Sequence, residues 1–272
     1  MKMNYRLVVA GLLVLGISCA KNPFTGKSTL ALVPDSEIYP SSFQQYNQFL
    51  SENKVVKGTK DVQRVENVGM KIKAAAEKWL NANGYQGYLK DYKWEYNLVD
   101  SKEVNAWCMP GGKIVFYTGI LPICKDDAGM ATVMGHEVAH ALLNRGQQRM
   151  SAGLLQQLGA AGVGAAVGNK SAETQQIAMT AYGVTTQYGG MLPFSRKHES
   201  EADKIGLTLM AIAGYNPDTA VAFWQRMAAN SGGQAQPEFL STHPSNETRI
   251  AEIRNLIPQS KAEAKKFGVV FK

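Results

Sequence analysis

The sequence contains little of several features that define whole classes of protein. Three cysteines in 272 residues are too few for a scaffold built on disulfides. It contains no internal repeat, and its GKS segment has Lys21 where a phosphate-binding P-loop requires the first glycine. The formal net charge of +7 comes from scattered basic residues without a nucleic-acid-binding motif. We therefore expect no repeat array, no P-loop and no nucleic-acid partner.

The N-terminal residues have the layout of a targeting signal. Lys2 and Arg6 form a charged start, and an apolar run over 7–17 follows, which is too short to span a bilayer as a mature helix. The small residue Ser18 ends the run. This order of charged, apolar and small residues predicts a secretory signal peptide over residues 1–18.

Cys19 follows directly after the predicted cleavage site. A cysteine there resembles a bacterial lipobox, although Leu15 lies four residues before it rather than three. We expect residues 19–34 to tether the protein to a membrane through a lipid on Cys19, with plain signal cleavage or an uncleaved anchor as alternatives. The other two cysteines, Cys108 and Cys124, are expected to be buried free thiols; in an exported protein one disulfide between them is the alternative.

The rest of the chain is patterned mainly for helices. Apolar residues three and four apart predict a helix over 61–80, and alternation predicts a strand over 93–99. A strand–turn–strand unit is predicted over 104–118, with Pro110-Gly111-Gly112 as its turn. We therefore expect an α+β fold, mostly helical with a small sheet, in a single domain over residues 35–272. Further helices are predicted over 128–144, stopped by Gly146, and over 195–213, 216–230 and 245–256 before Pro258. The Gly- and Ala-rich segment 151–168 is expected to be a helical arm or lid, with membrane contact as an alternative.

The run HEVAH lies in the middle of the predicted helix 128–144. Residues four apart return to the same helix face, so the imidazoles of His136 and His140 can bind one metal ion. Glu137 lies about 100° further round the helix, close to the metal without binding it, where a general base for water is needed. The sequence has only four histidines, so two core histidines at this spacing are a poor alternative. The run predicts a zinc-dependent hydrolase.

A catalytic zinc needs a third protein ligand and an open fourth position. The segment SRKHESEAD, about sixty residues further along the chain, offers four candidates on a second predicted helix. Glu199 and Asp203 are four apart and share a face, so Asp203 can orient an imidazole if Glu199 binds zinc. We favour Glu199 as the ligand, with His198 and Glu201 as alternatives. A solvated acidic first turn is the purely structural explanation.

Four segments together resemble a known family. NAWCMPGG, GHEVAHALLNRG, SRKHESEADKIG and STHPSNETR, in this order, are similar to the M48 metallopeptidases, specifically the exported bacterial group related to the mitochondrial inner-membrane protease of that family. The resemblance extends from about Asn22 to Arg254 and implies a zincin-like fold. It implies one zinc ion per chain, with His136, His140 and Glu199 as ligands, Glu137 as general base and Asp203 behind the ligands.

The resemblance also implies roles for His243 and Arg249 in HPSNETR. The family positions that they match face the metal site and steady the tetrahedral oxyanion. In some relatives the equivalent histidine instead occupies the open zinc position and holds the enzyme inactive. Without the resemblance, His243 before Pro244 is more simply a turn residue.

The leading hypothesis is an exported zinc metalloendopeptidase that cleaves misfolded or misassembled proteins of the bacterial cell envelope. The resemblance alone implies this quality-control role and a periplasmic lipoprotein at the outer membrane. An edge strand within 104–118 would bind the polypeptide substrate as an added strand. Gly111 and Gly112 would allow close backbone approach there, or simply form the turn.

Two alternatives belong to other classes. One is a chaperone-like periplasmic lipoprotein whose zinc site is held inactive by His243. The other is a structural or storage zinc site with four protein ligands. The intact Glu137 favours the enzyme, because neither alternative needs a base beside the metal.

Overall fold

The computed structural model describes residues 19–187, 192–230, 238–243 and 247–271. Within these residues the chain forms two compact units, one of residues 19–38 and 144–198 and the other of residues 39–143 and 199–271. The predicted signal peptide, residues 1–18, lies outside the described residues, and so does the side chain of Cys19. The predicted boundaries after residues 18 and 34 therefore stay predictions.

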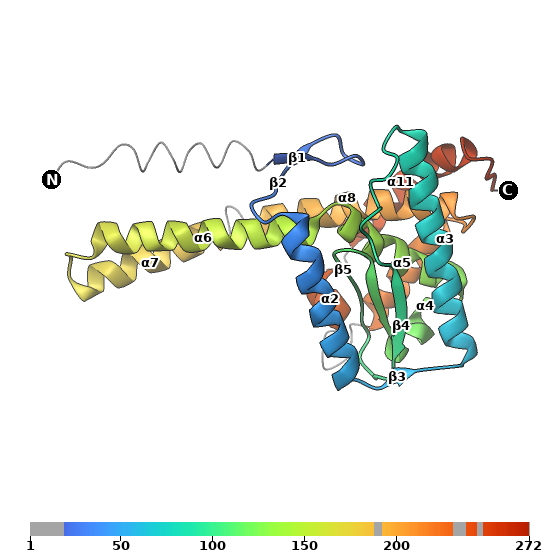
Figure 1. Cartoon of the computed structure of the whole chain (residues 1–272), viewed down its shortest axis with the longest axis horizontal. Coiled ribbons are helices and arrows are strands. Elements are labelled where there is room, and N and C mark those ends of the chain that lie inside the picture. Colours follow the sequence, from blue (N-terminus) through green and yellow to red (C-terminus); the bar gives the residue numbers. More distant parts are fainter. Residues whose placement is uncertain (1–18, 188–191, 231–237, 244–246, 272) are drawn as a thin grey trace. The chain divides into compact units, whose positions relative to one another are not determined.

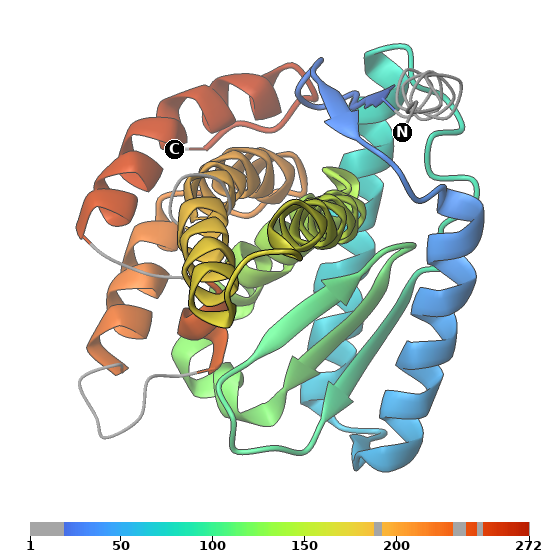
Figure 2. The same cartoon turned by 90° about the vertical axis from the view of Figure 1, so that its left-hand side faces the viewer.

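The larger unit is built around one mixed sheet (Figure 2). Two strands run parallel in its centre, and an antiparallel strand pairs with each of them on the outer side. One edge strand belongs to the predicted strand–turn–strand unit, which is confirmed. In spatial order the strands are β3 (Val55–Val56), β4 (Glu95–Val99), β6 (Lys113–Tyr117) and β5 (Ala106–Met109).

The turn between β5 and β6 has a backbone conformation and a packing that require glycine at two positions. Gly111 and Gly112 have φ angles of +82° and +86°, which L-residues rarely adopt. A Cβ at Gly111 would lie 2.5 Å from the Phe43 ring, and one at Gly112 would lie 2.8 Å from the Trp94 ring. The conformation and packing of the turn are thus sufficient to explain both glycines. Close approach of a substrate backbone is not needed as an explanation.

Helices cover both faces of this sheet (Figure 2). On one face Tyr46 of α2 (Asp35–Glu52) packs with Val99, Val115 and Tyr117. Side chains alternate along β4, so Tyr96 points to the opposite face, where its ring lies against Gly69 of α3 (Lys60–Ala82). Helix α5 (Asp127–Leu142) contacts both α3 and β5. The helix that carries HEVAH is therefore fixed beside the free edge of the sheet.

The remaining elements of the larger unit complete a mostly helical α+β fold, as predicted. The predicted helix over 61–80 is confirmed as α3. Cys108 and Cys124 are both free thiols, and burial raises the pKa of Cys124 to about 12. The other elements are a 3₁₀ turn (Thr118–Ile120), α4 (Leu121–Cys124), the part of α8 (Leu192–Ile212) from residue 199 onward, α9 (Thr219–Asn230), α10 (Glu238–Thr242) and α11 (Glu247–Lys265).

Three sequence predictions about helix ends are wrong. Gly146 does not stop the HEVAH helix, because α5 already ends at Leu142 and the next helix contains Gly146. Asn144 makes the break with a left-handed φ of 55°. Helix α8 begins at Leu192 rather than Ser195, and α9 at Thr219 rather than Asn216.

Pro258 misled the prediction for the last helix. Helix α11 does not end before Pro258 but continues to Lys265. Its buried residues on both sides of the proline lie three or four apart, so packing of one face outweighs the lost backbone hydrogen bond. The predicted start at Ser245 lies outside the described residues. Helix α2, which contains Pro40, was not predicted at all. The buried residues of α11 are Arg249, Ile253, Ile257, Ser260 and Ala264.

The smaller unit contains a short antiparallel pair, β1 (Cys19–Lys21) and β2 (Ser28–Leu30), and a helical hairpin of α6 (Arg145–Val167) and α7 (Ala172–Thr186). The two helices of the hairpin lie side by side (Figure 1). Most of the predicted helical arm, 151–168, is confirmed within α6. None of the described helices combines the length and the apolar character needed to cross a membrane.

Candidate metal centre

Helix α5 holds the HEVAH residues in the interior of the larger unit. The Asp126 side chain caps the helix by accepting a hydrogen bond of 2.8 Å from the Gly129 backbone N–H. From Gly129 to Leu142 every residue of the helix is buried. His136 and His140 consequently project from a rigid element into a space shielded from water.

Two glycines let a second helix approach α5 closely. A Cβ on Gly135 would lie 2.7 Å from the carbonyl oxygen of Gly206, and a Cβ on Gly206 would lie 2.8 Å from the backbone nitrogen of His136. The backbones of α5 and α8 are therefore in direct contact, which no side chain would permit. This contact brings Glu199, two turns before Gly206, to the two histidines.

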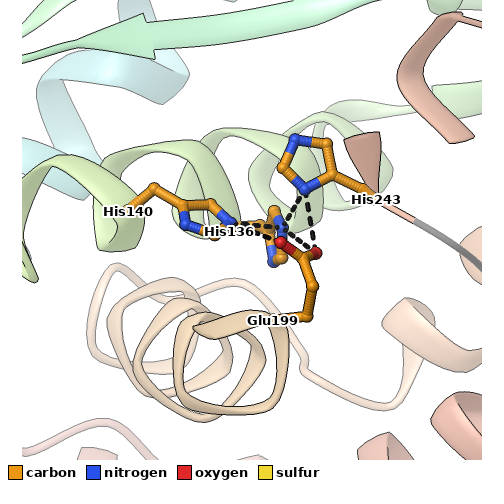
Figure 3. A group of neighbouring side chains, drawn as sticks. All are labelled: His136, His140, Glu199 and His243. Atoms are coloured by element: carbon orange, nitrogen blue, oxygen red, sulfur yellow. Dashed lines mark hydrogen bonds and ion pairs between the residues drawn. The ribbon is translucent and has the colours of Figure 1, made fainter. Parts of the chain in front are cut away.

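Four side chains from distant parts of the chain meet at one point (Figure 3). Nε2 of His140 lies 3.1 Å from Nε2 of His136, and the two oxygens of Glu199 lie 3.2 and 3.3 Å from these nitrogens. Nδ1 of His243 lies 2.8 Å from Oε2 of Glu199 and 3.1 Å from Nε2 of His136. The donor atoms of all four residues lie within 4.8 Å of one another. Among the described residues this cluster includes neither His198 nor Glu201.

The cluster fits a tetrahedral zinc ion. Donor atoms at about 2.0–2.1 Å from such an ion are roughly 3.3 Å apart. The donor atoms of the cluster are 2.8–3.3 Å from their neighbours, near this value, and zinc prefers imidazole nitrogens and carboxylate oxygens as donors. Two imidazole nitrogens that face each other at 3.1 Å also need a proton or a cation between their lone pairs. The donor set thus suits a divalent cation.

Glu199 gives the cluster a negative charge, and a bound metal ion would displace the proton that His136 holds. Burial lowers the pKa of His140 to about 3, so this imidazole is neutral, the form that binds metals. Burial also lowers the pKa of His136, but hydrogen bonds with Asp203 and Glu199 outweigh it and raise the value to about 9. Burial raises the pKa of Glu199, yet its three histidine partners hold it far below the usual range. A permanent negative charge therefore lies between the imidazoles.

Asp203 and Arg249 form a buried pair directly behind His136. Oδ1 of Asp203 lies 2.9 Å from Nδ1 of His136. Nε and Nη2 of Arg249 each donate to one oxygen of Asp203 at 2.8 Å, which is a bidentate arrangement. Although burial raises the pKa of Asp203, the charge of Arg249 lowers it to about 2. An ionised Asp203 favours a proton on Nδ1 of His136 and leaves the Nε2 lone pair for the metal.

Trp224 is a member of this network that sequence reasoning did not identify. The guanidinium carbon of Arg249 lies 3.7 Å from the centroid of the Trp224 ring, a cation–π contact. The same ring meets His136 edge-on at 5.9 Å. Trp224 lies in the apolar stripe of α9, so the sequence pattern marks it only as a core residue. Trp224 and Arg249 are 25 residues apart along the chain, and no sequence motif links them.

Glu137 faces the cluster without belonging to it. Its Oε1 lies 3.3 Å from Nε2 of His243, so His243 contacts Glu137 with one nitrogen and the potential ligands with the other. Nη1 of Arg249 lies 3.3 Å from Oε2 of Glu199. The structure thus brings together all seven residues for which a role at the metal was predicted: His136, Glu137, His140, Glu199, Asp203, His243 and, paired with Asp203, Arg249.

Comparisons with known proteins agree with this arrangement. Residues 69–257 match the model of peptidase family M48. The mitochondrial metalloendopeptidase OMA1 of Saccharomyces cerevisiae is 33% identical over 213 residues, which cover 72% of this chain and 56% of that protein. OMA1 of Schizosaccharomyces pombe is 34% identical over 176 residues, 64% of this chain and 50% of its own length. The beta-barrel assembly-enhancing protease of Escherichia coli is 28% identical over 163 residues, 58% of this chain and 33% of its own. The chain thus spans about half, or less, of the length of these relatives.

Proposed function

Because the chain belongs to peptidase family M48, we propose that it is a zinc-dependent metalloendopeptidase that hydrolyses misfolded or misassembled proteins of the bacterial cell envelope. The observation that carries the proposal is the buried cluster of two imidazoles and a carboxylate with Glu137 beside it. The name of the Escherichia coli relative, which refers to the assembly of β-barrels, supports an envelope substrate.

In this proposal each residue of the site has a defined task. His136, His140 and Glu199 hold the zinc ion, and Asp203 fixes the tautomer of His136. When bound, the ion supplies Lewis acidity and lowers the pKa of water. Glu137 takes the proton of the attacking water and passes it to the leaving amine. The charge of Arg249 keeps Asp203 ionised. Nη1 of Arg249 also lies near Oε2 of Glu199 and stabilises the ionised form of that carboxylate.

The free edge of the sheet supplies a place for the substrate. Strand β5 (Ala106–Met109) pairs only with β6 in the described sheet and contacts α5. An extended polypeptide that adds to β5 as a further strand is bound by backbone hydrogen bonds, which accept many sequences. This mode suits unfolded polypeptides, because their backbone groups are available for pairing.

His243 acts as a lock on the resting enzyme in our proposal. Its Nδ1 lies 2.8 and 3.1 Å from the donor atoms of Glu199 and His136, close enough to be a fourth ligand. It follows the short helix α10, and we expect a substrate to bind in the productive position only after this imidazole has moved away from Glu199 and Glu137. The alternative, in which His243 steadies the oxyanion, requires the imidazole to point at the substrate rather than at the ligands.

The test is cleavage of casein, an unfolded substrate, by the purified protein. We expect slow cleavage by the wild type, complete loss with a chelator and recovery on addition of zinc. His243→Ala is expected to cleave several-fold faster, because the fourth position is then open. A slower His243→Ala variant would assign His243 to the oxyanion instead. If neither protein cleaves casein in the presence of zinc, the proposed protease activity is refuted. The metal site would then be structural or would serve binding alone.

For location, we propose a periplasmic lipoprotein that is anchored to the outer membrane by a lipid on Cys19. The support is the sequence of residues 1–19, with its charged start, apolar run and small residue before the cysteine. Cells that express the full chain and are fed radioactive palmitate should label the wild type and not Cys19→Ser. An unlabelled wild type would mean that the chain is cleaved or retained without a lipid.

A further inference from the structure

We propose that the helical hairpin α6–α7 docks on a lipid bilayer through its uncharged outer surface. Among the described residues nine large apolar side chains are exposed, and seven of them lie on these two helices. Ile177, Leu158 and Val184 are 63%, 60% and 52% exposed. Helix α7 has no buried residue and α6 has none after Ser151, so the hairpin has no core of its own. An apolar surface of this kind needs a partner.

The charges of the hairpin limit what that partner can be. Residues 150–187 contain one lysine and one glutamate, whereas 19% of the whole chain is charged. Arg149 lies in the first part of α6, and Lys170 and Glu173 lie at the turn between the helices, so α6 from residue 150 onward and α7 after Glu173 carry no charge. A surface that binds an acidic or basic partner carries complementary charges. The uncharged sides instead suit an environment without charges.

Some polar groups of the hairpin pair with each other between the two helices, whereas others, such as Gln157 and Gln176, are exposed. Nε2 of Gln156 on α6 donates to Oγ1 of Thr186 on α7 at 3.0 Å, and the Tyr182 hydroxyl donates to the Gln156 carbonyl at 3.0 Å. A Cβ on Gly159 would lie 2.1 Å from that hydroxyl, so the glycine leaves room for the Tyr182 side chain between the helices. Helix pairs in water bury apolar groups between them, whereas pairs in lipid use small residues and polar contacts there. The hairpin follows the second pattern.

The N-terminal tether connects the hairpin to a membrane. The Leu32 backbone N–H donates to Oγ of Ser151 at 3.0 Å, and Nε2 of Gln147 donates to the Val33 carbonyl at 2.8 Å. Cys19 is 13 residues before Leu32, a contour of at most about 45 Å. The lipid proposed on Cys19 would therefore keep the root of the hairpin near a bilayer. The lipid on Cys19 is part of the proposed function, whereas the apolar surface of the hairpin is observed independently of it.

The length of the hairpin favours docking into one leaflet. Helix α7 has 15 residues, which corresponds to about 22 Å, and a bilayer core is about 30 Å thick. The sides of the helices, rather than the polar turn at Lys170, present the exposed apolar residues. We infer that the hairpin lies in the interface with its apolar sides among the acyl chains.

Flotation with lipid vesicles tests the proposal. The protein is the chain from residue 19 with Cys19→Ser, which keeps all described residues except Cys19 and carries no lipid. We expect it to float with phosphatidylcholine vesicles, to bind equally well when phosphatidylglycerol is added, and to stay bound at high salt. The triple variant Leu154→Ser, Leu158→Ser and Ile177→Ser should lose at least about tenfold in partition coefficient.

The matched control is Met70→Ser with Val270→Ser, two exposed apolar residues of the larger unit that are 52% and 72% exposed. This variant should float like its parent, and circular dichroism should show unchanged helix content in both variants. A parent that does not float overturns the proposal. So does a parent that forms dimers in sedimentation experiments and loses them in the triple variant without binding vesicles, which would make the surface an interface between two copies. Since Cys19 is replaced and none of the metal-site residues is changed, failure here is distinct from failure of lipidation or proteolysis.

Discussion

Glu137→Gln is expected to reduce casein cleavage by about 10² to 10⁴-fold while the protein still binds one zinc ion. Glutamine has nearly the same shape as glutamate but cannot accept the proton of the attacking water. Glu137 lies outside the cluster of donor atoms, so its loss should leave the metal in place. The measurements are kcat/KM for a casein-derived peptide and the metal content of the purified protein.

Glu199→Gln is the matched control for this experiment. It makes the same chemical change at a residue whose two oxygens lie 3.2 and 3.3 Å from the imidazoles of His140 and His136. We expect this variant to lose both activity and zinc. If Glu137→Gln retained activity within about threefold of the wild type, another group would have to be the base. If it lost the metal as Glu199→Gln does, Glu137 would be a ligand.

Asp203→Ala is expected to have the largest effect on stability. It leaves the charge of Arg249 buried without its bidentate partner, which costs about 3–5 kcal/mol in the free energy of unfolding. It also removes the acceptor for Nδ1 of His136, 2.9 Å away, which should weaken zinc binding by about 10 to 100-fold. Urea unfolding in the presence of a chelator measures the first effect, and competition with a zinc indicator measures the second.

The double variant Asp203→Ala with Arg249→Met separates the two effects. Removing both charges should restore part of the stability, because no unpaired charge remains buried and Trp224 can pack against the methionine. Zinc affinity should stay low, since His136 still lacks its acceptor. If Asp203→Ala were as stable as the wild type, Arg249 would have found another partner or water. The pair of Asp203 and Arg249 would then not stabilise the site.

Local patterns in the sequence were sufficient for part of the site. His136 and His140 share a face because they are four apart in a helix, and the residues of 128–144 predict that helix without any tertiary information. The same spacing places Glu199 and Asp203 together on α8. The strand–turn–strand unit around Gly111 is equally local, since its turn requires residues that adopt positive φ.

Packing decided the features that join distant segments. His136 and His243 are 107 residues apart, and Arg249 lies 46 residues from Asp203, so no local pattern relates them. Trp224 under Arg249 is indistinguishable from a core residue in the sequence. Helix α11 continues through Pro258 because its buried face holds it, against the local preference of proline.

Helical periodicity is set within a few residues, so the sequence alone predicts one helix with two imidazoles and a base and a second helix with two carboxylates. The separation of these helices depends on the contact of Gly135 with Gly206, and the position of His243 between the ligands and Glu137 also depends on packing. The same holds for the pairing of Gln156 with Thr186 in the hairpin. Distances between elements follow from the packing of side chains that lie far apart along the chain, and no local pattern encodes them.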